Sequence, residues 1–379
     1  MELVALIGNG CSIAYNPELA MGPLTKSILT ELAETDSNIP AVEEALTDLA
    51  EAANRETGDR IQFFEDLFGP LERIGRSLAA MDRLGDILGG AAEISDALRK
   101  AGEFGEELHR RALGSALHVV AEKAKGNQNG LASENVRVPV DWLNKTRAGG
   151  QVRVFTLNYD ALLDGAIFQL ASEVSGLTVS DMADGRYATS FRVEGFRPVK
   201  AYPLRDDEEY PRDFVIYHLH GSLQWFEVDG RIWKAADLDD LRDLDFWRRY
   251  AQDTISSAPA VILSDQKTRA IERDPFRWAY DRFGDALQSA HGLLVVGYGF
   301  GDIPVNRTIL RGVIDTSFPI RVVDRTDDAE GRKEAIINSL VDLDDGPAWR
   351  KERTRTLLTD RLTVVGEGVP DAFETLDWE

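Results

Sequence analysis

Short apolar runs separated by helix-like stretches are the feature of this sequence that most limits its fold. Six runs of five to seven residues are bounded by glycine or polar residues, as buried parallel strands usually are. They span residues 3–8, 152–157, 214–220, 260–264, 293–299 and 320–324, and residues 361–366 are a candidate for a last strand. Helical patterns, including 276–290 and 303–314, separate most of them. This alternation predicts an α/β fold, a Rossmann-like doubly wound parallel sheet.

Residues 18–150 interrupt the alternation, because they contain helical patterns but no convincing strand. The clearest helical patterns are 24–34, 41–53 and 94–124. An amphipathic stripe on the last of these consists of Leu98, Ala101, Phe104, Leu108 and Ala112. We therefore expect a large all-helical module inserted after the first strand, with the polar stretch 125–135 as its flexible exit.

Composition excludes several classes of function. A formal net charge of −22 argues against unaided binding to a nucleic-acid backbone, which requires clustered Lys and Arg. The single cysteine, Cys11, cannot form an intrachain disulfide or a four-cysteine zinc module. No apolar run approaches the ~18 residues of a membrane span, and the N-terminus shows no secretion signal. We expect a cytoplasmic protein that binds neither membrane nor metal.

Four segments whose residues could bind a ligand or catalyse a reaction follow predicted strands. They lie at the edge where open α/β sheets bind ligands. The first is GNGCS, residues 8–12. Gly8 and Gly10 permit a tight turn and close approach to a phosphate, and Ser12 can donate its hydroxyl or cap a helix. A plain strand-to-helix turn remains the alternative. We expect Cys11 to be a small filler rather than a nucleophile.

The second and third segments are TLNYD (156–160) and HLHGS (218–222). Asn158 offers a donor and an acceptor, and Asp160 an acceptor, although an ordinary cap of the next helix would also explain them. Strand alternation places His218 and His220 on the same side of the sheet. On its own, this pattern fits two hydrogen-bonded histidines on a half-buried face.

The fourth segment is GYGFGD (297–302), with Asn306 on the helix that follows. The next strand closes with Asp324, 27 residues after Gly297. A glycine-rich turn, a helix, a strand and a terminal acid resemble a dinucleotide fingerprint, in which the acid accepts hydrogen bonds from ribose hydroxyls. The glycine spacing departs from the usual fingerprint.

Taken together, these segments resemble the sirtuin-like superfamily, particularly its NAD-hydrolase branch in bacterial anti-phage defence systems. The family's Gly-Ala-Gly-x-Ser turn is similar to GNGCS, in which Asn9 replaces the alanine. The family's Thr-Gln-Asn-x-Asp segment is similar to TLNYD, in which Leu157 replaces the glutamine. Its catalytic His-Gly pair matches His220 and Gly221. The resemblance covers residues 1–17 and 151–330, which we take as the NAD-binding domain; 18–150 would be the inserted module.

The resemblance implies that NAD lies across the carboxyl edge of the sheet as the substrate. Asn158 and His220 would be catalytic, with His220 as the base, while His218 would be a satisfied strand histidine. The cofactor-binding residues implied by the resemblance are Gly8, Asn9, Gly10, Ser12, Asp160, Gly297, Gly299, Phe300, Asp302, Asn306 and Asp324.

The missing zinc ribbon of deacylating sirtuins makes water the simplest acceptor, so the resemblance implies NAD hydrolysis rather than deacylation. Such an enzyme requires a gate, and the branch includes homo-oligomers and complexes with HerA-type ATPases or phage-derived triggers. Two alternatives stay open: a non-catalytic NAD or ADP-ribose sensor, and a zinc-free deacylase or ADP-ribosyltransferase. Residues 331–379 form a C-terminal extension that could complete the sheet edge.

Overall fold

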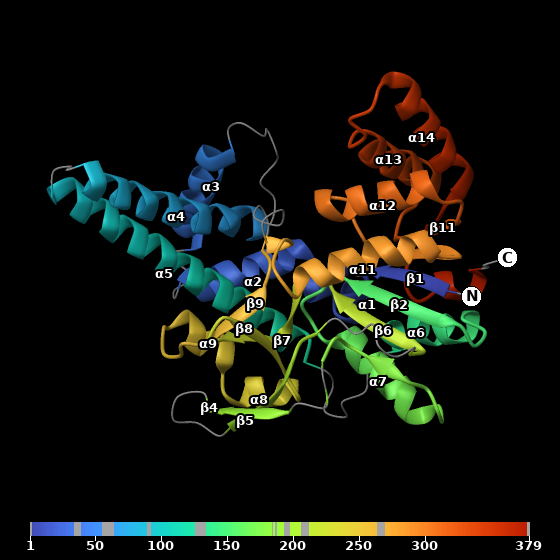
Figure 1. The fold of residues 1–379 in the computed structure, drawn as a ribbon, viewed down its shortest axis with the longest axis horizontal. Helices are drawn as coiled ribbons and strands as arrows, with labels where there is room; N and C mark the ends of the chain where they lie inside the picture. The colour runs from blue at the N-terminus through green and yellow to red at the C-terminus, as the bar shows by residue number, and fades with distance from the viewer. Residues whose placement is uncertain are drawn as a thin grey trace.

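The computed structural model describes residues 2–33, 39–54, 64–88, 92–125, 134–183, 185, 188–192, 198–205, 212–263 and 270–376. Its centre is a sheet of seven parallel strands in the order β12-β11-β10-β1-β2-β6-β3 (Figure 1). The strands are β1 (Glu2–Ile7), β2 (Gln151–Thr156), β3 (Val179–Ser180), β6 (Phe214–His218), β10 (Gly292–Val296), β11 (Ile320–Val323) and β12 (Leu362–Val365). From β6 to β12 this is the Rossmann order 3-2-1-4-5-6. The predicted doubly wound parallel sheet is confirmed.

Helices cover both faces of this sheet, which explains its continuous apolar runs. One face carries α11 (Phe276–Ser289), α12 (Ile303–Asp315), α13 (Ala329–Val341) and α14 (Ala348–Arg361). The other carries α1 (Asn9–Tyr15), α6 (Glu134–Thr146), α7 (Leu162–Glu173) and α15 (Ala372–Thr375). In β1, Val4 and Leu6 pack toward the first face and Leu3, Ala5 and Ile7 toward the second.

A second, antiparallel sheet was not predicted from the sequence. Its order is β4-β5-β8-β7-β9. The strands are β4 (Thr189–Arg192), β5 (Pro198–Pro203), β7 (Gly221–Val228), β8 (Arg231–Ala235) and β9 (Ala258–Val261), and the short helices α8 (Leu238–Asp243) and α9 (Phe246–Ala251) follow β8. The prediction of a parallel strand at 260–264 was wrong, since β9 runs antiparallel to β7.

Between β1 and β2 the described residues form helices and no strand, as expected for an all-helical insert. It contains η1 (Pro17–Leu19), α2 (Met21–Ala33), α3 (Ile39–Asn54), α4 (Phe64–Leu88) and α5 (Ala92–Lys123), followed by α6 on the sheet. Its core, with Phe68 and Leu117, is shared with Phe226 of the second sheet and Trp247 of α9. Residues 126–133 of the predicted exit lie outside the described residues.

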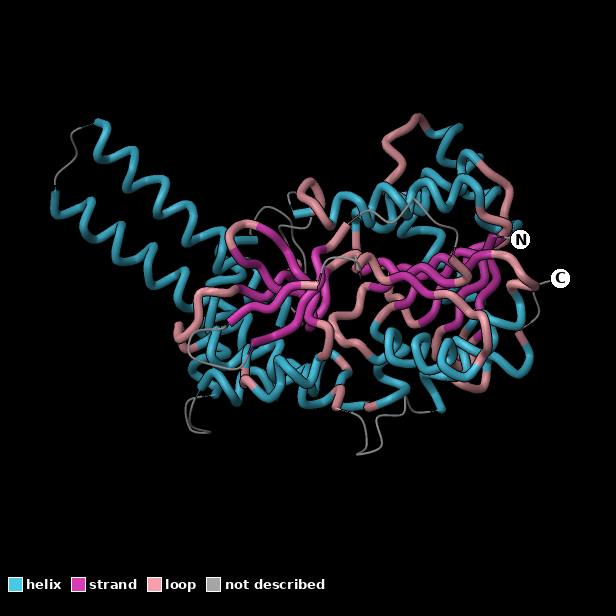
Figure 2. Tube along the Cα trace, turned by 60° about the horizontal axis from the view of Figure 1, so that its bottom comes forward, coloured by secondary structure: helices cyan, strands magenta, loops and turns pink. Residues whose placement is uncertain are grey.

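The helical hairpin α4–α5 projects from the body of the protein (Figures 1 and 2). The predicted stripe on α5 is therefore only partly used: Ala112 is buried, whereas Ala101 and Phe104 are exposed. Among the described helices, none combines the length and apolar character needed to cross a membrane.

Candidate active site

The register of the parallel sheet brings the predicted segments to one edge. Ile7 pairs with Thr156 and Val296, Thr156 pairs with His218, and Val296 pairs with Val323. The five strands thus end level with one another. The residues that follow them, including Gly8, Asn158, His220, Gly297 and Asp324, are grouped at this edge.

The glycine turn after β1 packs directly against the turn after β10. A Cβ atom on Gly10 would lie 2.5 Å from the Gly297 Cα, and one on Gly8 would lie 2.6 Å from the Gly297 oxygen. Gly297 itself has φ +60°. The Gly10 amide donates to the Gly297 carbonyl at 2.9 Å, and the Gly8 amide donates to Val296. In this structure the glycines allow the two loops to pack closely, and these two amides are not free to bind a phosphate.

The Asn9 side chain donates to the Leu19 carbonyl at 3.0 Å and ties the turn to the insert.

A buried hydrogen-bond chain joins the first two segments. The Asn158 Nδ2 donates to Ser12 Oγ at 2.8 Å, and Ser12 Oγ donates to Asp160 Oδ2 at 2.7 Å. Asp160 also accepts from the Leu162 amide at 3.1 Å, so the expected cap at the start of α7 is present as well. Burial raises the pKa of Asp160. The Asn158 Oδ1 is buried with no hydrogen-bond partner among the described residues, which leaves one acceptor for a ligand.

The space beside Asn158 is small because the insert closes it. A cavity of about 60 Å³ is lined by Asn9 and residues 157–160 on the sheet side. The insert contributes Leu19, Met21, Leu24, Phe64 and Val120. A drug-sized ligand needs about 300–1,000 Å³. A ligand of drug size or larger would fit beside Asn158 only if these insert residues moved away.

His220 lies on the other side of the sheet edge from His218. The expectation that both point the same way was wrong, because β6 ends at His218 and the chain turns at Gly221, where φ is +88°. The His220 Nε2 lies 3.2 Å from Asp302 Oδ2 and 3.3 Å from the Tyr280 hydroxyl. Its ring is 4% exposed and is not part of the lining of the Asn158 cavity.

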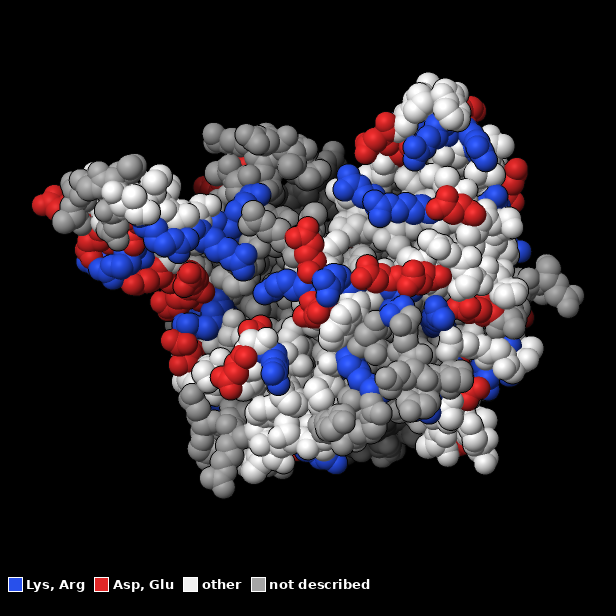
Figure 3. All heavy atoms as spheres, viewed as in Figure 1, with Lys and Arg blue, Asp and Glu red and all other residues white. Residues whose placement is uncertain are grey.

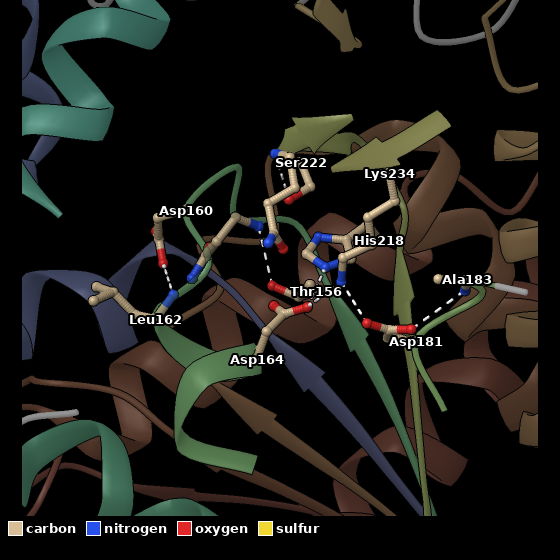
Figure 4. Close-up of polar contacts among 11 residues, drawn as sticks. Thr156, Asp160, Leu162, Asp164, Asp181, Ala183, His218, Ser222 and Lys234 are labelled. Carbon is tan, nitrogen blue, oxygen red and sulfur yellow. Dashed lines mark hydrogen bonds and ion pairs between the residues drawn. The ribbon is translucent and has the colours of Figure 1, made fainter. Parts of the chain in front are cut away.

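His218 belongs to a buried charge cluster (Figure 4). Its Nε2 lies 3.0 Å from Asp164 Oδ1, and the Lys234 ammonium lies 3.5 Å from the same oxygen and also contacts Asp181. Burial alone would raise the pKa of Asp164, but the charges of His218 and Lys234 hold it well below its usual value. The His218 Nδ1 has no hydrogen-bond partner among the described residues, so this histidine is only half satisfied. A cavity of about 600 Å³ borders the cluster.

The GYGFGD turn is braced internally. Tyr298 donates its hydroxyl to Asn306 Oδ1 at 2.8 Å, and the Asn306 Nδ2 donates to the Phe300 carbonyl at 2.7 Å. Asp302 caps α12 by accepting from the Val305 amide at 3.0 Å. Both polar ends of Asn306 are thus used to hold the turn. Unlike Gly297, Gly299 has open space where a Cβ would lie.

Asp324, the predicted ribose ligand, forms an ion pair. Its Oδ2 lies 2.7 Å from Arg332 Nε on α13, and its Oδ1 accepts from the Arg325 amide. Arg332 also donates to the Tyr298 carbonyl at 3.3 Å. A ribose hydroxyl at this position would meet a carboxylate already neutralised by a guanidinium.

Cys11 is buried, and burial raises the pKa of its thiol to about 12, with a further contribution from Asp160. A thiol of this kind is a packing group, as expected. Within the described ranges, no group of three or more His, Cys, Asp or Glu side chains is arranged to hold a metal ion.

Sequence reasoning missed Tyr280, Asp164 and Lys234. Asp164 follows Asp160 by one helical turn, so the i, i+4 spacing could have placed both at the start of α7. Tyr280 sits on the buried face of α11, where a tyrosine is not distinguishable by sequence from other core aromatics. Lys234 comes from the second sheet, for which the sequence provided no pattern.

Part of this chain is similar to a known protein family. The family model of the SIR2-like domain matches residues 152–322, from β2 into β11. One solved structure, described as "Structural Basis for the Mechanism and Regulation of Sir2 Enzymes", aligns with 98% of this chain and 90% of its own, with a TM-score of 0.37 and 12% identity. No curated protein matches the chain. This similarity to a SIR2-like domain covers less than half of the chain.

Proposed function

We propose that the protein hydrolyses NAD at the carboxyl edge of the parallel sheet, releasing nicotinamide and ADP-ribose. The observation that carries the proposal is the Asn158–Ser12–Asp160 chain, whose free amide oxygen lies at the same edge as the His220–Asp302 pair. Of these residues, Asn158, Asp160, His220 and Asp302 lie within residues 152–322, the region that matches the SIR2-like domain. With one cysteine, the chain cannot form a four-cysteine zinc ribbon, which favours water as the acceptor.

In the proposed reaction the bond between the ribose C1′ and the nicotinamide nitrogen breaks. Its electron pair neutralises the pyridinium, so no acid is needed at the leaving group, and positive charge develops on the ribose. Asn158 orients a ribose hydroxyl or the water through Oδ1. The water oxygen bonds to C1′ and gives its proton to His220. The products are nicotinamide, ADP-ribose and a proton.

Asp302 has a positioning role in this proposal. A carboxylate beside Nε2 favours the tautomer that carries its proton there, which leaves the Nδ1 lone pair to accept a proton. Asp302 and His220 are both almost fully buried, so the pair is poorly screened by solvent.

Asp302→Asn tests this role without removing the helix cap, because asparagine caps as well as aspartate. We expect the turnover number to fall roughly tenfold or more, with little change in melting temperature. Tyr280→Phe is the matched control, since it removes the other Nε2 neighbour and no charge. A full-rate Asp302→Asn enzyme contradicts the role. The measurement is nicotinamide release over a range of pH.

The closed cavity provides the gate that a toxic hydrolase requires. The insert residues that fill the space above Asn158 come from η1, α2, α4 and α5. Movement of these helices opens the site, and we propose that assembly or a partner protein drives it. This regulation would suit an effector of bacterial anti-phage defence, with a HerA-type ATPase or a phage-derived protein as candidate triggers.

Met21→Ala should relax the gate, because it removes a half-buried side chain from the cavity wall. We expect basal NAD turnover to rise about tenfold, the size of a typical coupling energy. Met81→Ala provides a matched control, since Met81 belongs to the same insert but is exposed and far along α4. Equal rates for the two variants would argue against gating at this wall.

A further inference from the structure

A second cavity lies between α7 and the antiparallel sheet. Its volume is about 600 Å³, within the range of small-molecule sites, and it shares no lining residue with the cavity beside Asn158. Its wall consists of residues from α7, the antiparallel sheet, α8 and the ends of α1 and α5. The proposed reaction uses none of these side chains, so the substrate of that reaction does not explain this cavity.

Acidic side chains outnumber basic ones in the wall of the second cavity. Among the described residues, four aspartates line it, whereas the basic residues of the lining are Lys234 and Arg242. The four are Asp164, Asp181, Asp237 and Asp239. Both basic side chains are already engaged, since Lys234 contacts two of the aspartates and Arg242 donates to a third at 3.0 Å. The wall therefore favours a cation and repels an anion.

One of these carboxylates lacks a hydrogen-bond donor. Asp164 is 3% exposed, and its Oδ1 is shared by His218 and Lys234, whereas its Oδ2 has no hydrogen-bond partner among the described residues. Figure 4 shows how closely the members of this cluster lie: Asp164, Asp181, His218 and Lys234. A buried carboxylate oxygen without a donor is unfavourable in free energy. We therefore expect the occupant of the cavity to bring a hydrogen-bond donor.

Aromatic and aliphatic side chains form the rest of the wall. Phe168 on α7 lines the cavity and keeps 42% of its surface exposed, and Tyr202 on β5 lines it as well. The ammonium of Lys234 lies 6.0 Å from the centroid of the Phe168 ring, so this ring already has a cation at the distance of a cation–π contact. Leu162 and Leu238 add apolar surface. A ligand with a cationic head and an apolar chain would use both kinds of surface.

We propose that the second cavity binds a small aliphatic amine with one or two ammonium groups. An ammonium group donates three hydrogen bonds and accepts none, which matches a wall with an excess of carboxylates and an unused carboxylate oxygen. The methylene chain of the amine packs against Phe168 and the leucines of the wall. The proposal is independent of the proposed NAD hydrolysis, because it rests on the cavity and its side chains alone.

An NMR titration of 1,4-diaminobutane with the full chain, observed on the ligand signals, tests the proposal. We expect a saturable site with a dissociation constant of ~1 mM or below, which is reasonable for so small a ligand. 1,4-Butanediol has the same chain length and no charge, and it should bind at least about tenfold more weakly. Absence of saturable diamine binding, or equal affinity for the two compounds, overturns the proposal.

Two substitutions at exposed positions show whether the amine occupies this cavity. Phe168→Leu removes the ring and keeps an apolar side chain. Asp237→Asn removes a charge and keeps the cap of α8, in which the Asp237 side chain accepts from the Asp239 amide at 2.9 Å. We expect each substitution to raise the dissociation constant of the diamine about threefold, and both together about tenfold.

Matched controls distinguish this site from unspecific association of a cation with an acidic protein. The chain has a net charge of −22, and Figure 3 shows acidic side chains at several separate places on one face. Trp349→Leu removes an exposed ring from α14, and Asp281→Asn removes an exposed charge from α11. Both should leave the dissociation constant unchanged. Equal effects of the cavity variants and the controls, or no effect of either, contradict a site between α7 and the antiparallel sheet.

Discussion

His220→Ala is expected to reduce nicotinamide release from NAD by about 10²–10⁴-fold, the usual cost of removing a positioned base. His220 is the imidazole at the carboxyl edge whose Nε2 lies near Asp302 and the Tyr280 hydroxyl. Asn158→Ala should cause a loss of similar size, because it removes the free amide oxygen and breaks the contact with Ser12. Chromatography of NAD, nicotinamide and ADP-ribose measures both rates.

These losses of activity are informative only if both variants remain folded. We expect circular dichroism and gel filtration of both variants to match the wild type, with the melting temperature lowered by a few degrees. Ser222→Ala provides a control at a buried residue two positions from His220, and it should retain activity. NAD consumption at the wild-type rate in both His220→Ala and Asn158→Ala would refute the assignment.

Asp164→Asn is expected to lower the free energy of unfolding by about 3–5 kcal/mol, as does the loss of one partner from a buried ion pair. The substitution removes the negative charge that Asp164 offers to both His218 and Lys234, and leaves the ammonium of Lys234 with Asp181. Urea denaturation of both proteins measures the difference. A change below about 1 kcal/mol would mean that the cluster does not stabilise the fold. Asp239→Asn, on the exposed side of α8, is the control.

The difference in the free energy of unfolding between the wild type and Asp164→Asn depends on pH. The charges of His218 and Lys234 lower the pKa of Asp164 in the folded state below its unfolded value of about 3.9. The stabilisation is therefore fully present above that unfolded pKa and is lost as the pH falls toward the folded pKa. We expect the difference between the wild type and Asp164→Asn to be present above about pH 5 and to shrink below about pH 4.

The parallel sheet could be predicted because its strands are buried on both faces. A run such as residues 293–296 is apolar without alternation, which is typical of a strand covered by helices. The same reasoning failed at 260–264. A short apolar run does not show its direction or its sheet, and β9 joins the antiparallel sheet that begins after the turn at Gly221.

The sequence was sufficient to predict that the site residues lie at the ends of the strands. It was not sufficient to predict which side chains they contact. Level strand ends place Asn158 and His220 at one edge whatever the helices do. Their partners come from distant elements: Asp302 caps α12, and Tyr280 belongs to α11. The side of the sheet on which His220 lies could not be predicted either, because side chains alternate only while the strand continues. Closure of the Asn158 cavity by the insert depends on helix packing that no local pattern encodes.

The central claim is that NAD is cleaved at this sheet edge, and nicotinamide release by the purified chain tests it most directly. NAD is incubated with the wild type, with Met21→Ala and with Met21→Ala combined with His220→Ala, and the products are separated by chromatography. The account predicts nicotinamide and ADP-ribose in equal amounts, more from Met21→Ala than from the wild type, and almost none from the combined variant. Intact NAD with both of the first two proteins, or release that survives the loss of His220, would contradict it.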